Sequence, residues 1–338
     1  MLLAARLRAQ LLSGVRPASP LEATRQLLAV QAQDPRGARL AIRARSTVKS
    51  ATSVDRALNE RELVITWVNR GTLHLVAVED EALLHLLTTP QLRTGCERRL
   101  RQEGVSEAAE RRGVRAVAAA LESGPHTREE LRGVVEQRRV PTAGQALVHL
   151  LFAATLDGLI VRGPMRGPHQ QFVLAADWLG HRPALDIESA AAELARRYLQ
   201  GHGPASARDL AKWAGIGLGA ARAALGLIAP QLVELPGGLV DLRDRPRPPH
   251  IPPAALLGAF DPLLLGWSDR DLIVGEDQQR IVNGGVFRPF ALIAGRAAGT
   301  WSLERGRVSL DLWDKSPPRP STAAALAREA AAVESYLR

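Results

Sequence analysis

The chain has 338 residues, enough for two or three compact units. Hydrophobic residues make up 46% of it, so it can build real cores, and a disordered protein is excluded. The formal net charge is +9, and arginine supplies nearly all of the 44 basic residues. This excess favours a polyanionic partner, above all nucleic acid. Aromatic residues are only 4%, which argues against a platform that stacks single-stranded bases.

The cysteine and histidine content argues against a metal site. Cys96 is the only cysteine, so no internal disulfide and no cysteine-based zinc site can form. The eight histidines are scattered and show no His-Glu-x-x-His pattern. The N-terminus is too interrupted by arginine for a signal peptide, and no apolar run reaches membrane-spanning length. We therefore expect a soluble, cytoplasmic, monomeric protein without metal or cofactor.

Two stretches in the middle of the chain resemble each other, residues 124–131 and 203–210. In each, a hydroxyl residue after Gly-Pro, Thr127 or Ser206, is expected to cap a short helix. An amphipathic helix precedes each capped helix, and a further helix and two short strands follow. This order is typical of the winged form of helix-turn-helix. The expected helices are 113–123, 143–156, 187–200 and 218–228, and the strands are 159–162, 171–174, 231–235 and 239–242.

A weaker third copy opens the chain, and a different composition closes it. Ser19 is predicted to cap a helix whose first position is Pro20, and Asn69-Arg70-Gly71 to form a strand turn. A proline-rich connector at 243–253 leads to glycine-broken strands and a final helix capped by Ser321. The remaining expected helices are 2–12, 21–33, 38–45, 53–59 and 321–338, and the strands lie around 63–67, 72–76, 291–294, 299–303 and 307–312.

We therefore predict an α+β protein in which tandem winged-helix (helix-turn-helix) units precede a small C-terminal β-rich domain. The first winged-helix unit would also carry two glutamines, described next. The predicted boundaries are 1–110, 111–185 and 186–245 for the three winged-helix units and 254–338 for the C-terminal domain with its closing helix.

Gln31 and Gln33 stand on either side of Ala32, just before Asp34 and Pro35. In an ideal α-helix, residues two apart lie about 200° around the axis, so the two amides would diverge. Pro35 disfavours a helical Asp34, so the helix is expected to end near Gln33. A frayed last turn could then bring both amides to one site. The alternative is a polar helix end that satisfies its own last carbonyls.

Four stretches together resemble the AlkZ-like family of winged-helix DNA glycosylases, relatives of the YcaQ proteins. They span nearly the whole chain in the family's order. The resemblance implies removal of alkylated purines, including bulky and crosslinked N7 adducts, through a Gln-x-Gln or Gln-x-Asp motif. That motif is here Gln31-Ala32-Gln33, and Ala32 is smaller than the aliphatic residue usual in the family. The stretches are Leu28-Ala29-Val30-Gln31-Ala32-Gln33, residues 67–76, residues 260–270, and residues 282–290 running on to 299–301.

The chemistry of an amide fits that reaction. A glutamine amide donates and accepts hydrogen bonds but takes no proton at neutral pH. An N7-alkylated purine is cationic and leaves as a neutral base, so its glycosidic bond is already weakened. The pair then needs only to position a water and stabilise an oxocarbenium-like sugar. We expect a monofunctional DNA glycosylase that hydrolyses this bond with catalytic Gln31 and Gln33. Asp34 could serve as a base instead, although its place before Pro35 better suits a turn or cap.

Several residues are candidates for binding double-stranded DNA that carries alkylated purines. Arg70 sits in a turn and could reach a phosphate, or it could be a solvated turn arginine. His74 lies mid-strand, where a core histidine is the commoner case. Arg270 either pairs with Asp269 or, as the resemblance suggests, faces DNA. A glycine turn can project into a groove, and basic residues attract phosphates. The candidates are Arg43, Arg45, Arg70, His74, Arg270, Asn283 and Gly284.

Two other functions fit the same scaffold. A winged-helix transcription regulator needs side chains that read base edges, and the helices offer few: Gln145 and His149 in one, Arg222 in the other. A non-catalytic DNA-binding protein would keep the fold and lose the activity. The size of the lesion, base flipping, and the choice between self-protection and general repair are left open.

Overall fold

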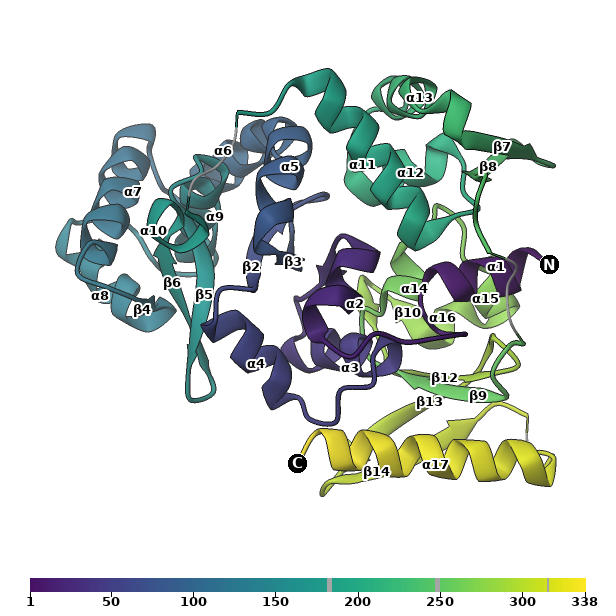
Figure 1. Ribbon diagram of the computed structural model, residues 1–338. Helices are drawn as coiled ribbons and strands as arrows, with labels where there is room; N and C mark the ends of the chain where they lie inside the picture. The colour runs from purple at the N-terminus through teal and green to yellow at the C-terminus, as the bar shows by residue number, and fades with distance from the viewer. Residues whose placement is uncertain (181–183, 247–249, 315) are drawn as a thin grey trace. The chain divides into compact units, whose positions relative to one another are not determined.

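The computed structural model describes residues 1–180, 184–246, 250–314 and 316–338, so residues 247–249 of the predicted connector lie outside the described residues. The chain divides into two compact units, each built from separate stretches of sequence (Figure 1). Unit 1 comprises Met1–Val54, Ala191–Trp213 and Gly217–Arg338. Unit 2 comprises Asp55–Ala190 and Ala214–Ile216.

Unit 2 is organised around antiparallel strands in the order β3-β2-β5-β6-β4. Helices α6, α7, α8 and α9 contribute Leu100, Val117, Leu131 and Leu150 to one core, which also takes in Phe172 of β6. The elements are β2 (Leu63–Val68), β3 (Thr72–Ala77), α5 (Val78–Thr88), η1 (Pro90–Leu92), α6 (Arg93–Gln102), α7 (Glu107–Leu121), β4 (His126–Thr127), α8 (Arg128–Gln137), α9 (Ala146–Leu156), β5 (Ile160–Arg166), β6 (His169–Leu174) and α10 (Ala175–Leu179).

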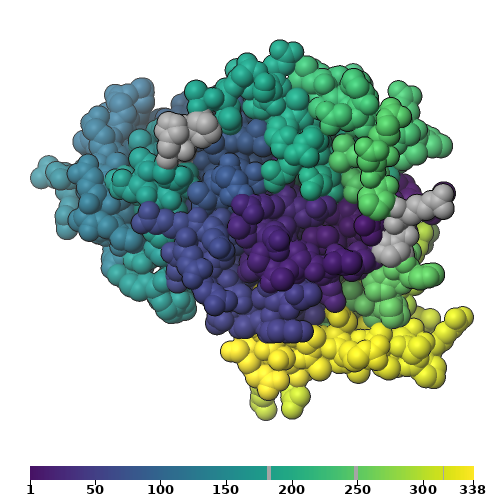
Figure 2. All heavy atoms as spheres, in the orientation of Figure 1, coloured from purple at the N-terminus to yellow at the C-terminus, as the bar shows by residue number. Residues whose placement is uncertain are grey.

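Unit 1 contains a four-stranded antiparallel sheet in the order β14-β13-β12-β9. Helix α17 lies along this sheet and forms a continuous ridge on the surface (Figure 2). Leu256, Trp301, Leu326 and Tyr336 form the core between them, with Leu40 of α3. The strands of this sheet are β9 (Ala254–Leu257), β12 (Phe290–Ile293), β13 (Arg296–Glu304) and β14 (Arg307–Leu312), and α17 is Pro320–Tyr336.

The rest of unit 1 is mostly helical. Helix α4 (Thr52–Asn59) carries the chain into unit 2, and α11 returns it to unit 1. The further elements are α1 (Leu2–Ala9), α2 (Pro20–Leu27), β1 (Val30–Gln31), α3 (Pro35–Arg45), α11 (Ile187–His202), α12 (Ala207–Ala214), α13 (Leu218–Leu227), η2 (Ala229–Gln231), β7 (Leu232–Leu235), β8 (Leu239–Leu242), α14 (Pro262–Leu265), α15 (Asp271–Val274), η3 (Gly275–Asp277), α16 (Gln278–Ile281), β10 (Val282–Asn283) and β11 (Val286–Phe287).

The predicted helix caps at Thr127 and Ser206 are confirmed. The Thr127 hydroxyl accepts from the Glu130 backbone N–H, and the Glu130 carboxylate accepts from the Thr127 N–H, a complete capping box. Ser206 and Asp209 make the same two bonds. The expected order of helix, capped helix, helix and two strands is present twice, as α7-α8-α9-β5-β6 and as α11-α12-α13-β7-β8.

Several predicted boundaries are wrong, including the end of the helix before the glutamines. The helix expected to reach Gln33 ends at Leu27, because Leu28 adopts φ 64° and cannot continue it. Strand β5 runs through the expected turn to Arg166, so this hairpin is longer than predicted. Helix α17 starts at Pro320 with Arg319 as its N-cap, so Ser321 lies inside the first turn. Proline already has helical φ and lacks the N–H, which favours it at the first position. Among the described helices, none has the length and apolar character needed to cross a bilayer.

Candidate functional site

The two glutamines lie outside any helix: Gln31 ends strand β1, and Gln33 stands in a bend two residues later. On a helix, side chains two apart would diverge. The Gln31 Nε2 donates a hydrogen bond of 2.7 Å to Gln33 Oε1. Gln31 is buried, at 6% exposure, while Gln33 is exposed. The structure therefore brings both amides to one place through a strand end and a bend, and not through the frayed helical turn that we predicted.

Asp34 caps the helix that follows. Its Oδ1 accepts from the backbone N–H groups of Arg36 at 2.9 Å and Gly37 at 3.1 Å, and Pro35 takes the first position of α3. The cap role that the sequence favoured over a catalytic base is confirmed. Gly37 faces the backbone of Ala259, where an added Cβ would lie 2.3 Å from the carbonyl oxygen. The first turn of α3 is thus pressed directly against residue 259.

A buried ion pair ties α3 to the segment after residue 259. Arg45 donates to both carboxylate oxygens of Asp261, at 2.9 and 2.6 Å, and both side chains are fully buried. The same guanidinium donates to Gln10 Oε1 at 3.0 Å. Arg45 was predicted to attract DNA, but its charge is already neutralised inside the protein. We correct that expectation to a structural role.

Arg43 is also bound to partners within the protein. Its Nη2 donates to the Leu256 carbonyl at 2.8 Å and to Glu329 Oε2 at 2.9 Å, and its side chain is 7% exposed. A DNA phosphate would have to displace Glu329 of α17 to reach it. The predicted DNA contact is therefore replaced by a link between α3, β9 and α17.

The hairpin of β10 and β11 projects an exposed tip. Asn283 pairs with Val286, and the loop between them is Gly284 and Gly285, with φ of 56° and 82°. Positive φ at both positions defines a type I′ turn, for which Gly-Gly is a preferred sequence. Asn283 and Gly284 are exposed, as predicted for groove contacts, and Val286 is 61% exposed.

The base of this hairpin is held by aromatic contacts. The ring of Phe287 lies 5.1 Å from that of Phe260, and the Arg270 guanidinium lies 5.3 Å from the Phe287 ring. Arg270 Nε also donates to the Leu264 carbonyl at 2.6 Å. Burial lowers the pKa of Arg270, partly offset by the nearby charge of Asp269. Arg270 thus packs against Phe287 at the base of the hairpin.

A cavity of about 300 Å³ opens beside these groups, between the first turn of α3 and β11. Asp34 and Gly37 line it from α3, and Phe260, Phe287 and Arg288 from the other side. Phe260 adopts φ 55°, a strained conformation for an aromatic residue. The sequence did not single out Phe260 or Phe287 individually, because nothing local links two aromatic residues so far apart in the chain.

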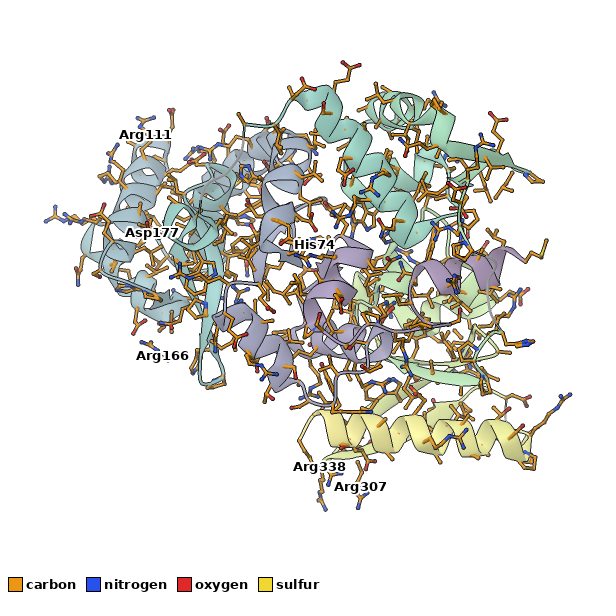
Figure 3. All side chains as sticks on the ribbon, in the orientation of Figure 1. His74, Arg111, Arg166, Asp177, Arg307 and Arg338 are labelled. Atoms are coloured by element: carbon orange, nitrogen blue, oxygen red, sulfur yellow. The ribbon has the colours of Figure 1, made fainter. Side chains whose placement is uncertain are left out.

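His74 belongs to the core of unit 2. It is 2% exposed on β3, and its Nδ1 lies 2.8 Å from the Thr72 carbonyl oxygen (Figure 3). Burial, reinforced by the positive charge of Arg70, lowers the pKa of His74 to about 3. The ring is therefore neutral at physiological pH, and the structure favours the core alternative over a lesion contact.

Arg70 stands in the turn between β2 and β3, as predicted. Asn69 and Gly71 on either side have φ of 57° and 77°, and the Asn69 N–H donates to Thr88 Oγ1 at 2.7 Å. Arg70 lines a cavity of about 250 Å³ in unit 2, together with Arg98 and Arg99 of α6. Helix α6 was not predicted, although its run of arginines is visible in the sequence as a cluster of charge.

Within the described ranges, no group of three or more His, Cys, Asp or Glu side chains is arranged to hold a metal ion. The groups that the structure shows at the glutamine motif are the two hydrogen-bonded amides and the Asp34 helix cap that follows them.

Three comparisons with known proteins agree. The family model described as DNA glycosylase AlkZ-like matches residues 24–336. The interstrand DNA cross-link repair glycosylase of Streptomyces sahachiroi is 28% identical over 314 residues, which cover 82% of this chain and 80% of the relative. The solved structure of Streptomyces sahachiroi DNA glycosylase AlkZ is similar with a TM-score of 0.81 at 23% identity, over 99% of this chain and 95% of that one. The two folds are the same.

Proposed function

Because the chain belongs to the family of AlkZ-like DNA glycosylases, we propose that it hydrolyses the N-glycosidic bond of N7-alkylated purines in double-stranded DNA. Bulky adducts and interstrand crosslinks are included, since the curated relative is an interstrand DNA cross-link repair glycosylase. The observation that carries the proposal is the hydrogen bond between the Gln31 and Gln33 amides, beside an exposed surface.

The two glutamines have different roles in this proposal. Gln33 Oε1 accepts one hydrogen bond from Gln31, and a carbonyl oxygen has a second lone pair for a water O–H. Gln33 is exposed and is the catalytic residue that touches the water and the sugar. Gln31 is buried and acts as a positioning residue that fixes the orientation of the Gln33 amide. The carbonyl dipole also stabilises positive charge developing on the sugar.

The bonds balance without a general acid. The water oxygen bonds to C1′ of the sugar as the C1′–N9 bond breaks, and that electron pair neutralises the cationic purine. The water proton passes to solvent. A neutral purine carries no such charge and leaves poorly, so the reaction is selective for cationic bases. The enzyme is thus a monofunctional hydrolase with no covalent intermediate.

The architecture supports DNA binding. We propose that the two observed helix, capped helix, helix and hairpin series are winged-helix units at 111–185 and 186–245, beside a first unit at 1–110 and a C-terminal domain at 254–338. Asn283 and Gly284 would enter a groove at the tip of their hairpin, supported by Arg270. Arg70 would contact a phosphate.

Single-turnover excision of N7-methylguanine from a defined duplex tests the proposal. We expect release by the wild type, and a rate at least roughly tenfold lower in Gln33→Ala, about 1.4 kcal/mol of barrier. Gln31→Ala should be slower than wild type, with duplex affinity unchanged in both. Gln137→Ala, an exposed glutamine of unit 2, is the matched control and should keep the wild-type rate.

Two outcomes of this experiment would contradict the proposal. If the wild type releases neither the methylated base nor a crosslinked base while still binding duplex, the chain is a non-catalytic DNA-binding protein. If excision occurs and survives both glutamine substitutions, hydrolysis stands but the assignment of the glutamines is wrong.

A further inference from the structure

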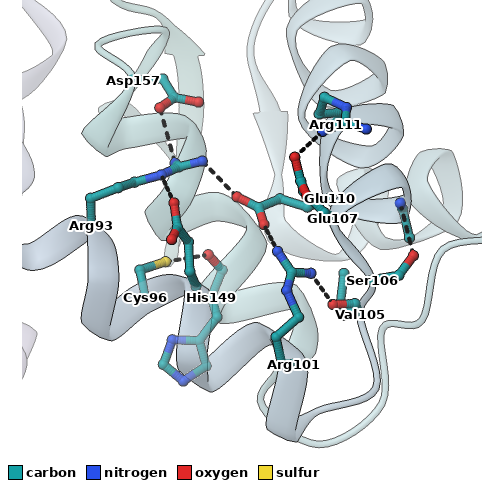
Figure 4. Close-up of polar contacts among 12 residues, drawn as sticks. Arg93, Cys96, Arg101, Val105, Ser106, Glu107, Glu110, Arg111, His149 and Asp157 are labelled. Atoms are coloured by element: carbon teal, nitrogen blue, oxygen red, sulfur yellow. Dashed lines mark hydrogen bonds and ion pairs between the residues drawn. The ribbon is translucent and has the colours of Figure 1, made fainter.

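The arginines of α6 divide into two groups. Arg93 forms ion pairs with Glu97 at 3.0 Å, Glu110 at 2.7 Å and Asp157 at 3.0 Å. Arg101 forms one with Glu110 at 2.6 Å. Figure 4 shows this network of carboxylates around the two arginines. The charges of Arg93 and Arg101 are therefore balanced within unit 2.

Arg98 and Arg99 are not balanced in this way. Both are exposed, and within the described chain neither forms an ion pair with a carboxylate. Arg99 donates only to the neutral Gln102 Oε1, at 3.1 Å. Glu103, the next acid along the chain, accepts from the Gln145 backbone N–H at 3.0 Å. Two adjacent cations thus stand on the helix surface without an internal counter-ion.

Arg70, in the turn between β2 and β3, lines the same cavity as Arg98 and Arg99. Arg70, Arg98 and Arg99 line one cavity of about 250 Å³, whose described lining contains no carboxylate. The turn is anchored, because Asn69 is bonded to Thr88 and the α-carbon of Gly71 is packed near Leu92 and Phe152. The backbone of Arg70 is therefore held in place before any ligand binds, which lowers the entropic cost of binding.

The rest of the lining is apolar or neutral. Leu92 and Phe152 form part of the wall, and His149 lines it as well. Burial lowers the pKa of His149, with Glu103 opposing and Arg99 reinforcing the shift, so the imidazole adds no positive charge at neutral pH. Guanidinium groups next to apolar side chains suit the DNA backbone, in which charged phosphates alternate with sugars that expose C–H groups.

We propose that Arg70, Arg98 and Arg99 form a phosphate-binding site of unit 2 that takes the backbone of duplex DNA. Guanidinium groups bind phosphate oxygens through paired N–H donors, without reading the base sequence. The site extends the proposed function to a second surface. Its test uses undamaged DNA, so it is read separately from the excision chemistry.

The test is the salt dependence of duplex affinity, measured by fluorescence anisotropy between about 50 and 200 mM salt. Each lost phosphate contact should lower the slope of log affinity against log salt by about 0.9. In the Arg98→Gln/Arg99→Gln variant the slope should therefore fall by about two such decrements, and duplex affinity should be roughly tenfold weaker at the lower salt. In Arg70→Gln the slope should fall by about one decrement.

Matched controls separate a site from bulk charge. Arg112→Gln/Arg115→Gln removes two exposed arginines from α7 of the same unit and should leave the slope nearly unchanged. Arg98→Lys/Arg99→Lys should retain most of the slope, since lysine still binds phosphate as a point charge. Saturating excision rates of the Arg112→Gln/Arg115→Gln control should stay within twofold of wild type.

Two results would overturn the site. One is an Arg98→Gln/Arg99→Gln slope no smaller than that of the α7 control. The other is displacement of the duplex by inorganic phosphate or a mononucleotide that exceeds the effect of its ionic strength. Such displacement would indicate a site for free phosphate. A wild type that cannot excise bases but shows the expected slope changes would reject the proposed function and keep this inference.

Discussion

Gln31 donates from its buried amide to the exposed amide oxygen of Gln33, 2.7 Å away. The two amides differ in exposure, because Gln33 meets solvent whereas Gln31 is buried. The hydrogen bond is possible because α2 has already ended at Leu27, so the two amides do not diverge as they would on a helix.

The first prediction is that the effects of substituting the two glutamines on the excision rate are not additive. Gln33→Leu should lower the single-turnover excision rate at least roughly tenfold, because it removes the oxygen that we propose orients the water. Gln31→Leu should lower it less. The double variant should be no slower than Gln33→Leu alone, since residues acting as one unit give non-additive losses. Full additivity of the two effects would instead mean that each amide contacts the substrate independently.

The second prediction concerns the buried pair of Arg45 and Asp261. Asp261→Ala leaves an uncompensated buried charge and should lower the free energy of unfolding by about 3–5 kcal/mol. Arg45→Met with Asp261→Leu should lose less than Asp261→Ala, because neither charge is then stranded. Denaturant unfolding measures both.

A surface pair provides the control for this measurement. Arg307 lies 3.0 Å from Glu334, and its side chain is 83% exposed (Figure 3). Arg307→Ala should change the free energy of unfolding by no more than about 1 kcal/mol. If Asp261→Ala were equally mild, the pair would not hold the segment that carries Phe260.

The third prediction is a pH dependence of stability due to His74. The pKa of His74 is about 3 in the folded protein, against an ordinary value of 6.5 for histidine. Between these values the unfolded state binds the proton and the folded state does not, so stability falls as pH falls from about 6.5 towards 3. The slope contributed is at most about 1.4 kcal/mol per pH unit. His74→Gln should show a shallower acid limb in unfolding measured against pH, and an unchanged limb would show that His74 is protonated in the fold.

The fourth prediction concerns the tip of the β10–β11 hairpin. Val286→Asp should weaken duplex binding and slow excision at limiting enzyme, because the new carboxylate repels phosphates and the apolar tip is lost. The exposed position makes an effect on unfolding small. Val15→Asp, at a residue 91% exposed in the same unit, is the control and should have a smaller effect. Equal loss in the two variants would assign the effect to net charge, with no special part for the hairpin.

Features made by chain neighbours were accessible from the sequence. The caps of Thr127, Ser206 and Asp34 use hydrogen bonds to residues within three positions, so local chemistry determines them. The turns at 69–71 and 284–285 follow from glycine and asparagine, which tolerate positive φ. The motif stretches that resembled the glycosylase family could also be read without a structure, and the family match agrees with them.

Other features depended on partners far along the chain. Nothing local shows that Arg45 meets Asp261 or that Arg43 meets Glu329, so two internal arginines looked like DNA contacts. Arg98 and Arg99 resemble Arg93 and Arg101 in sequence, and only packing decides which of them receive carboxylates. Burial and charge balance are properties of the assembled fold.

The glutamine motif shows both sides of this division. The sequence by itself determined which residues stand in the motif and, through Pro35, that a helix could not simply continue past Asp34. Tertiary structure decided that the preceding helix stops at Leu27, with Leu28 at φ 64°, although Leu28 and Ala29 are good helix formers. Local propensity is worth less than about 1 kcal/mol per residue, so packing overrides it and ends the helix before the two amides.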